Sequence, residues 1–316
     1  MRVVLPVRGG QWLGQNLGEV TALVPASIPS PSSGVLELGP LSIHLYGVTL
    51  LVAIAAAVVL TGIRWTRLGG DWDLVLRTAV WGVAAGIVGA RLYHVVTSWD
   101  DVPDPKWWGV FAVWKGGLGV WGGILFGVVA GAIVVRRAGQ SGLLMMDAVA
   151  PGLLLAQGIG RIGNYFNQEL FGKPTTLPWG LEIDPENRPP QYAFDDTFHP
   201  TFLYELAYDL AGVALLLWVG SRFRIKPPGL FALYVAYYTF GRTFEELLRV
   251  DPAHELWGLR LNAYVSMVLF VAAAAFFVWW QFFRRDGRPE APAARREPPH
   301  AVERRAVPKR RVRPSR

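Results

Sequence analysis

Residues 143–164 read LLMMDAVAPGLLLAQGIGRIGN, an apolar stretch that contains an arginine near its end. About 20 apolar residues in a helix cross the ~30 Å hydrocarbon core of a bilayer. An arginine inside such a helix costs at least ~2.5–3.5 kcal/mol, so it usually faces a partner or a water-filled cavity. The stretch therefore predicts a membrane protein that places Arg161 in an internal polar site.

The polar residues of this stretch share one helical face. They recur at intervals of four, three and four residues, which is the period of an α-helix. They are Gln157, Arg161, Asn164 and Gln168. A simpler interpretation is an arginine that reaches the outer interface from the helix end. Asn167 and Glu169 lie so close in the chain that a site is favoured over a single interfacial charge.

Low charge extends over most of the chain. Its 316 residues are 52% hydrophobic and 17% charged, whereas a soluble domain carries about 25% charged residues. Seven stretches are long and apolar enough to span a bilayer: 43–64, 75–97, 117–135, 143–164, 201–220, 229–248 and 262–283. We expect an all-α integral membrane protein of about seven transmembrane helices. Residues 165–200 are expected to form a small extracytoplasmic cap.

The two ends of the chain differ from this membrane domain, which we expect over residues 28–283. Residues 1–27 lack a continuous apolar core of signal-peptide length and are expected to form a flexible extension. Residues 284–316 are rich in Arg, Pro and Ala, which is typical of a disordered tail. This tail carries 12 of the 31 lysines and arginines, so the pI of about 9.8 does not indicate a nucleic-acid partner.

The distribution of basic residues predicts the orientation in the membrane. Lysine and arginine are enriched in cytoplasmic loops. If the basic tail is cytoplasmic, three basic loops fall on the same side; they contain Arg64 and Arg67, Arg136 and Arg137, and Arg222, Arg224 and Lys226. The cations of the opposite loops are offset by acidic residues. An outside N-terminus and a cytoplasmic C-terminus fit this pattern best.

The chain contains no cysteine. It therefore has no thiolate nucleophile, disulfide or cysteine-ligated metal of its own. We expect no metal and no cofactor, and any thiol that takes part in the chemistry has to come from the substrate.

A second cation lies in the apolar stretch 229–248. Arg242 is surrounded in sequence by tyrosine and phenylalanine. Arg242 with Glu246, and Glu245 with Arg249, are spaced as ion pairs on one helix. A structural ladder of ion pairs accounts for Glu245 and Arg249. Arg242 lies deeper in the stretch, so we favour a ligand role for it.

Further polar residues stand at the predicted outer ends of helices. His44 and Tyr46 open the first stretch, and His199 precedes the fifth, which contains Glu205 about a turn inside. His199 is equally well interpreted as an ordinary interfacial histidine. Of these residues, Tyr46, His199 and Glu205 can converge near the outer half of the bilayer with Arg161, Arg242, Asn164 and Glu169. Two guanidinium groups suit a phosphate, because each makes forked, charge-assisted bonds to it, and a phosphate at this depth belongs most naturally to a phospholipid headgroup.

Glycines recur every four residues in the third stretch, at Gly119, Gly123, Gly127 and Gly131. They form a smooth ridge on a helix. Close packing against another helix is the favoured interpretation, and a groove for a lipid tail is the alternative.

The longest motif is Gly160-Arg161-Ile162-Gly163-Asn164-Tyr165-Phe166-Asn167-Gln168-Glu169-Leu170-Phe171-Gly172. It is accompanied by His44-Leu45-Tyr46-Gly47, Gly89-Ala90-Arg91, Trp114-Lys115-Gly116-Gly117, His199-Pro200 with Leu203-Tyr204-Glu205, and Gly241-Arg242 with Glu246 and Arg249. In residue type, order and spacing these motifs resemble those of the bacterial prolipoprotein diacylglyceryl transferases. The resemblance covers residues 28–283.

The resemblance implies a transferase of the bacterial plasma membrane. Such an enzyme moves the diacylglyceryl group of phosphatidylglycerol to the lipobox cysteine of a prolipoprotein, forming a thioether and releasing glycerol phosphate. Phosphatidylglycerol, prolipoproteins and membrane lipid would be its partners, and seven helices with a periplasmic cap its fold. The catalytic candidates are Arg161, Arg242, Glu205, His199 and Tyr46. The candidates for binding phosphatidylglycerol are Arg161, Asn164, Asn167, Glu169, Gly172, Arg242 and His44.

One departure from the family concerns the proton acceptor. Some relatives carry a histidine where this chain has Trp121. The thiol proton must then pass to another group, for which the candidates are Glu205, His199, His44 and Glu169. A lipid or anion transporter without catalysis is the rival class. Transporters of the common designs show repeated halves or matching broken helices, and this sequence shows one polar helix without a counterpart.

The loop charges generate a first prediction. Because the native chain has no cysteine, single cysteines placed in the tail beyond Arg284 and in the 165–200 connection report on one site each. An impermeant thiol reagent added to intact cells should label the connection and leave the tail unlabelled. The reverse pattern would contradict the orientation.

Overall fold

The computed structural model describes residues 27–39, 41–253 and 255–284. The predicted flexible extension and basic tail therefore lie, apart from Ser27 and Arg284, outside the described residues. Within them, each of the seven predicted apolar stretches is a helix. The long helices are α1 (Leu45–Arg67), α2 (Trp72–Thr97), α4 (Val120–Arg137), α5 (Gly142–Asn167), α6 (Thr201–Arg222), α7 (Gly229–Leu248) and α8 (Leu261–Val278), which continues as a π-helical turn, Trp279–Phe283.

Six of these helices are long and apolar enough to cross a membrane, by length and composition. The remaining one, α7, is 20 residues long. It carries Arg242, Glu245 and Glu246 in its second half. A mostly helical membrane protein is thus confirmed, and a count of seven spans stays a prediction.

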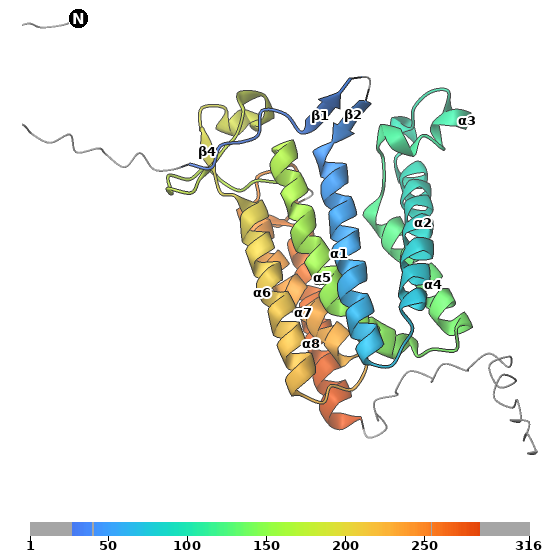
Figure 1. Cartoon of the computed structure of the whole chain (residues 1–316). Helices are drawn as coiled ribbons and strands as arrows, with labels where there is room; N and C mark the ends of the chain where they lie inside the picture. The colour runs from blue at the N-terminus through green and yellow to red at the C-terminus, as the bar shows by residue number, and fades with distance from the viewer. Residues whose placement is uncertain (1–26, 40, 254, 285–316) are drawn as a thin grey trace, which may run out of the picture.

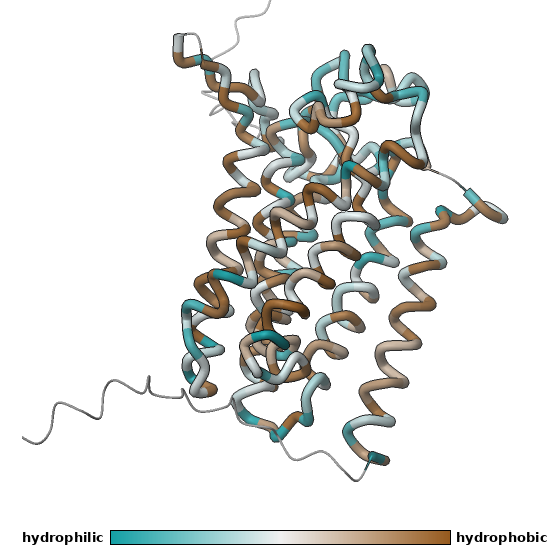
Figure 2. Tube along the Cα trace, turned by 90° about the vertical axis from the view of Figure 1, so that its right-hand side faces the viewer, coloured by the Kyte–Doolittle hydropathy of each residue, from teal (hydrophilic) through white to brown (hydrophobic). Residues whose placement is uncertain are grey.

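Helix α5 is the central element of the bundle. Helices α1, α6 and α7 all pack against it, and Figure 1 shows α5 between α1 and α6. Half of its apolar segment is buried inside the protein, whereas only 11% is buried in the segment at α8. Large apolar side chains of α1, α2, α4 and α8 are exposed. Hydrophilic residues gather mainly in the loops at the two ends of the bundle (Figure 2). This is the distribution that a surrounding bilayer stabilises.

Helices α2 and α4 form a close pair because glycines let their backbones meet. A Cβ atom on Gly122 would lie 2.2 Å from the carbonyl oxygen of Gly89, so neither position leaves room for a side chain. On the predicted ridge, a Cβ atom on Gly123 would lie 3.5 Å from the carbonyl oxygen of Gly86, and one on Gly127 would lie 3.1 Å from that of Gly82. The predicted close packing of the glycine ridge is therefore confirmed. Gly119, which the sequence placed in the helix, is its N-cap and packs on Tyr93.

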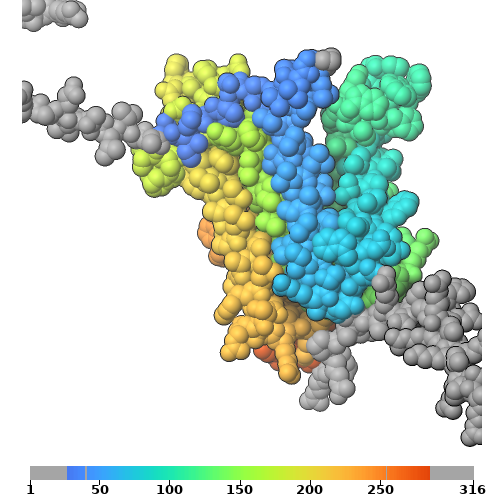
Figure 3. Space-filling view, in the orientation of Figure 1, coloured from blue at the N-terminus to red at the C-terminus, as the bar shows by residue number. Residues whose placement is uncertain are grey.

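The α2–α4 pair meets the rest of the bundle near the α1–α2 turn. There the indole of Trp72 packs over Gly62, and that of Trp65 over Gly70. Toward the other end the outline is notched between the start of α1 and the α2–α3 region (Figure 3). The loop above α2 is held by buried Arg91, whose guanidinium donates to the carbonyl oxygens of Gly109, Val110, Gly116 and Gly117.

Short elements lie between the helices. The strands form three antiparallel hairpins or pairs: β1 (Val35–Leu38) with β2 (Leu41–His44), β3 (Leu181–Glu182) with β4 (Thr197–Phe198), and β5 (Glu255–Leu256) with β6 (Leu259–Arg260). A single-turn helix, α3 (Lys106–Gly109), follows α2. The 165–200 connection packs on its own small core of Phe171, Leu181, Ile183 and Phe198.

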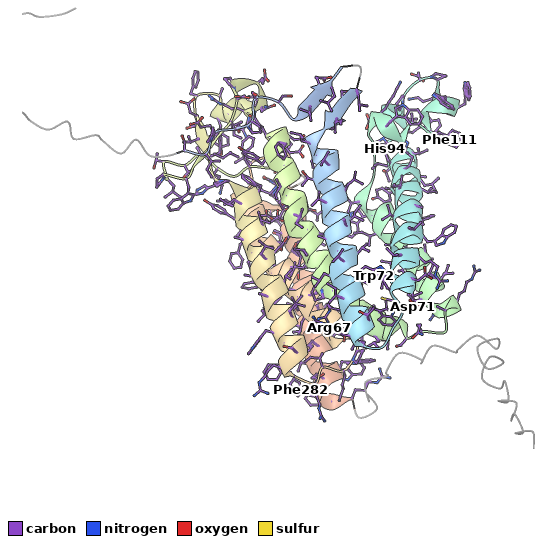
Figure 4. All side chains as sticks on the ribbon, viewed as in Figure 1. Arg67, Asp71, Trp72, His94, Phe111 and Phe282 are labelled. Carbon is purple, nitrogen blue, oxygen red and sulfur yellow. The ribbon has the colours of Figure 1, made fainter. Side chains whose placement is uncertain are left out.

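The two ends of the bundle differ in charge. The turns after α1, α4 and α6, with their arginines, lie at one end, and the β1–β2 hairpin, α3 and β4 lie at the other (Figure 1). Figure 4 shows Arg67 and Asp71 at the first end and His94 and Phe111 at the second. The three basic loops therefore share one end of the bundle, as the sequence predicts. Which end faces the cytoplasm stays a prediction.

Candidate active site

A buried carboxylate joins the two predicted arginines. Arg161 of α5 forms an ion pair through Nε with Oε2 of Glu205 on α6. Arg242 of α7 reaches the other oxygen, with Nη1 3.3 Å from Oε1. The Glu205 side chain is 8% exposed. Three helices thus bring together residues that are distant in the chain. Arg161, Arg242 and Glu205 lie in contact, as the sequence predicts.

Arg242 has two further acidic partners on its own helix. Its Nη1 lies 2.7 Å from Oε2 of Glu245, and its Nη2 pairs with Oε1 of the completely buried Glu246. The Arg242–Glu246 pair follows the predicted helical spacing. The predicted Glu245–Arg249 pair is wrong, because α7 ends at Leu248 and the Arg249 side chain turns to other acids.

The ion pairs continue into the segment after α7. Arg249 contacts Asp251 through Nε at 2.7 Å, and Arg260 on β6 contacts Oε2 of Glu246 through Nε at 2.7 Å and Oδ2 of Asp251 through Nη2 at 2.8 Å. With Arg161, Glu205, Arg242 and Glu245, these residues form one connected network, which we call the arginine–carboxylate network. It has four arginines and four carboxylates, so its formal charges cancel. Buried charges persist only when they are paired in this way.

Amide side chains adjoin the network at Arg161. Asn164 lies with Oδ1 3.5 Å from Nη1 of Arg161, and its Nδ2 donates to Oε1 of Glu169 at 2.8 Å. Asn167 donates to the same oxygen at 3.3 Å. Asn164, Asn167 and Glu169 therefore form a polar group beside Arg161, at the end of α5 where the sequence predicts a site.

Two other members of the predicted polar face have different roles. Gln157 accepts a hydrogen bond from the hydroxyl of Tyr234 on α7 at 3.1 Å. Gln168 is not on the helical face, because α5 ends at Asn167 and Gln168 adopts the left-handed conformation at its C-cap, with φ 49°. Its side chain instead holds the 165–200 connection through two hydrogen bonds with Asp184. That part of the prediction is wrong.

Tyr46 and Gly172 border the site. The ring of Tyr46 packs on Gly163, where a Cβ atom would lie 2.5 Å from it, so Tyr46 sits beside the turn that carries Arg161. Gly172 lies against His199 and Leu248, and its amide donates to the carbonyl oxygen of His199 at 2.9 Å. Gly172 thus anchors the 165–200 connection to the ends of α6 and α7.

The two candidate histidines lie outside the arginine–carboxylate network. The Nδ1 of His199 is 3.1 Å from the hydroxyl of Tyr204. Burial lowers the pKa of His199. His44 is exposed at the N-cap of α1. The structure therefore brings neither histidine against the two arginines.

A pocket of about 230 Å³ opens beside the network between α6 and α7. Its lining combines Glu205, Arg242 and Glu245 with aromatic rings, among them those of Tyr238 and Phe244. Asp209, one turn from Glu205, also lines it and is buried. Neither carboxyl oxygen of Asp209 accepts a hydrogen bond from the residues that the structure describes.

Three residues of the network and its pocket are not among the site residues predicted from the sequence: Glu246, Asp209 and Arg260. The sequence does indicate two of them, because Glu246 stands four residues after Arg242 and Asp209 four residues after Glu205, so each shares a helical face with a predicted site residue. It gives no such indication for Arg260. In the sequence it is one of several charges in a connecting loop, and its contacts depend on how α7 and β6 meet.

The arrangement favours binding of an anion with several oxygens. Two guanidinium groups contact different oxygens of one carboxylate, next to amide side chains and a pocket lined partly by aromatic rings. Preorganised charged donors of this kind stabilise negative charge that develops on a leaving group. A phosphate ester with apolar chains fits both the charge and the surroundings.

Comparisons with known proteins agree on one family. The sequence profile of the family described as prolipoprotein diacylglyceryl transferase matches residues 33–279. A protein of Cutibacterium acnes is 46% identical over 277 residues, which are 87% of this chain and 93% of the relative. Proteins of Bifidobacterium adolescentis and Streptomyces coelicolor are 43% and 48% identical, each covering 80% of both chains. All three are named phosphatidylglycerol–prolipoprotein diacylglyceryl transferases.

The loop part of the network predicts a pH-dependent stability. Burial acts to raise the pKa of Asp251, but hydrogen bonds and charges from Arg249 and Arg260 outweigh it and hold the pKa below its usual value. A carboxyl group with a lowered folded pKa contributes stability above its unfolded pKa of about 3.9, and this is lost as the pH falls through the folded value. Asp251→Asn should therefore unfold at a lower temperature than the native protein at pH 7, and the difference should shrink below about pH 4.

Thermal unfolding in detergent, followed by circular dichroism, measures this difference. Asp196→Asn is the matched control, because Asp196 pairs with Arg188 at 2.9 Å while 82% exposed, so its loss should matter little. A deficit of Asp251→Asn that is equal at every pH would contradict the assignment.

Proposed function

The chain belongs to the prolipoprotein diacylglyceryl transferase family, and on that premise we propose how its arginine–carboxylate network carries out the transfer. The enzyme moves the diacylglyceryl group of phosphatidylglycerol to the cysteine thiol of a prolipoprotein. The sulfur forms a bond to the glyceryl carbon, and the bond between that carbon and the phosphate oxygen breaks. Its electron pair leaves with glycerol phosphate. A transporter without catalysis does not account for this family membership.

The observation that carries the proposal is the sharing of Glu205 by Arg161 and Arg242. Each guanidinium contacts a different oxygen of the one carboxylate. A phosphate presents several oxygens to the same two guanidinium groups and can accept a forked pair of bonds from each. When phosphatidylglycerol binds, its phosphate takes the place of the Glu205 carboxylate between the two guanidinium groups. The same groups then stabilise the charge that collects on the phosphate as it leaves.

The exchange also supplies a proton acceptor. Displacement deprives the buried Glu205 carboxylate of both its cationic partners, and uptake of the proton of the attacking thiol neutralises the charge that is left unpaired. The other candidates are less well placed. His199 is engaged with Tyr204, and Glu169 with Asn164 and Asn167. Trp121, at the position where some relatives have histidine, is an exposed residue of α4 and has no acid–base group.

The remaining assignments follow from position. Asn164 assists Arg161 at the phosphate, and Tyr46, packed on Gly163, borders the same place. Asn167, Glu169 and Gly172 border the phosphate site on the side of the 165–200 connection. The basic loops after α1, α4 and α6 face the cytoplasm, so the network lies toward the outer side of the plasma membrane. The apolar flanks of α6 and α7 accommodate the acyl chains.

Removal of either guanidinium should abolish most of the activity. Arg161→Ala and Arg242→Ala should each lower kcat/KM by about 10²–10³, the usual loss for a donor that stabilises a leaving oxyanion. Arg→Lys should recover little of it, since an ammonium group lacks the forked geometry. The assay incubates purified protein with phosphatidylglycerol and a lipobox peptide and follows the mass of the peptide.

Arg77→Ala is the matched control, because Arg77 is an exposed arginine of α2 paired only with Asp73 among the described residues. It should keep native activity. Full activity of Arg161→Ala or Arg242→Ala would contradict the phosphate assignment.

A further inference from the structure

Arg260 is a buried cation that lies outside the reacting groups. It stands at the end of β6, immediately before α8, and is 8% exposed. Nε lies 2.7 Å from Oε2 of Glu246, Nη2 lies 2.8 Å from Oδ2 of Asp251, and Nη1 donates to the carbonyl oxygen of Asp251 at 3.1 Å. The two terminal nitrogens are hydrogen-bonded to Asp251, whereas Nε and Oε2 of Glu246 form an ion pair without hydrogen-bond geometry. All three nitrogens thus face a protein acceptor, and the contacts of Arg260 indicate no ligand of its own.

Glu246 connects Arg260 to the reaction site. Its carboxylate is completely buried, with Oε1 paired to Nη2 of Arg242 and Oε2 to Nε of Arg260. Arg249 lies farther away, with Nη1 3.7 Å from Oε1. One edge of the Arg242 guanidinium is therefore held by a carboxylate that is itself fixed on its far side by Arg260.

The planarity of the guanidinium carries this constraint to the phosphate. A guanidinium is rigid, so fixing Nη2 also sets the direction of Nη1. Nη1 is the nitrogen that faces Glu205 and Glu245. The edge of Arg242 that meets the phosphate in the proposed function is thus oriented from the segment after α7.

We propose that Arg260 is a positioning residue for the transfer: by fixing Glu246, it holds Arg242 in the orientation in which Nη1 faces the phosphate. The inference rests on the proposed phosphate-binding role of Arg242. Asp251 completes the support, because it binds Arg249 and Arg260 together and so keeps Arg260 in place.

Loss of the Arg260 charge leaves Glu246 with Arg242 as its main counter-ion. The carboxylate then draws Arg242 away from the phosphate, while Arg161 still binds the lipid. In Arg260→Gln, kcat should fall by about ten- to a hundredfold, as expected when a reacting group is misplaced by about 1 Å. The KM for phosphatidylglycerol should change less. Arg260→Lys keeps the charge but reaches one acid instead of two, so its kcat should be intermediate.

A double-mutant cycle separates a positioning role from an independent one. Arg242→Lys, Arg260→Gln and the double variant are assayed in full-length protein with phosphatidylglycerol and a lipobox peptide, per mole of folded protein. If Arg260 acts through Arg242, Arg260→Gln should cost little further activity in the Arg242→Lys background. Arg188→Gln is the matched control, since Arg188 is a largely buried arginine paired with Asp196 outside the network; its kinetic constants should be native.

The outcomes are distinguishable. If Arg242→Lys is impaired but Arg260→Gln has native kcat, the positioning role of Arg260 is overturned. The same holds if the losses of the two single variants multiply in the double variant. In both cases the proposed phosphate-binding role of Arg242 is retained. If Arg242→Lys has native activity, the proposed function fails and the role of Arg260 with it. Should Arg260→Gln not fold, Arg260→Lys decides: an intermediate kcat supports the proposal, and a native kcat overturns it.

Discussion

The constraint on which this molecule depends is the pairing of charge inside an apolar bundle. Arg161 and Arg242 lie within helices whose surroundings cannot solvate them, and each is matched by a carboxylate from another helix or another turn. Removal of one partner would leave a buried charge unpaired, which is costly. The packing of α6 and α7 around α5 is therefore coupled to the pairing of these groups, so a change that breaks an ion pair should also weaken the packing of the helices.

The same pairing underlies the proposed mechanism. A guanidinium whose partner is a carboxylate is preorganised for another oxyanion, so little rearrangement is needed when a phosphate arrives. Because Glu205 contacts both arginines, the proposed mechanism has a phosphate that binds them release Glu205 as a base at the same moment. The chain has no cysteine, in keeping with a thiol that belongs to the prolipoprotein. Binding of the lipid and activation of the thiol are then consequences of one exchange.

Much of this could be predicted from the sequence, for physical reasons that also explain the errors. The apolar stretches and the two costly arginines are local signals, and both led to the correct elements. The prediction that Gln168 lies on the polar face of α5 is wrong because Gln168 follows the helix end and adopts a left-handed conformation without being glycine. Glu245 was paired with Arg249 because helical spacing was extended past the end of α7. The contact of Arg260 with Glu246 depends on tertiary packing, which leaves no periodic signal.

The central claim is that Glu205 is exchanged for phosphate and then takes the thiol proton. The most direct test is the pH dependence of kcat for Glu205→Gln, measured with phosphatidylglycerol and a lipobox peptide alongside the native enzyme. The proposed exchange predicts that the variant no longer shows the acid limb of the native enzyme. Its activity should instead stay low at acidic and neutral pH and rise toward the thiol pKa of about 8.5, where the substrate ionises unaided. An unchanged acid limb, together with weaker binding of phosphatidylglycerol, would show that Glu205 only positions the arginines and would contradict the claim.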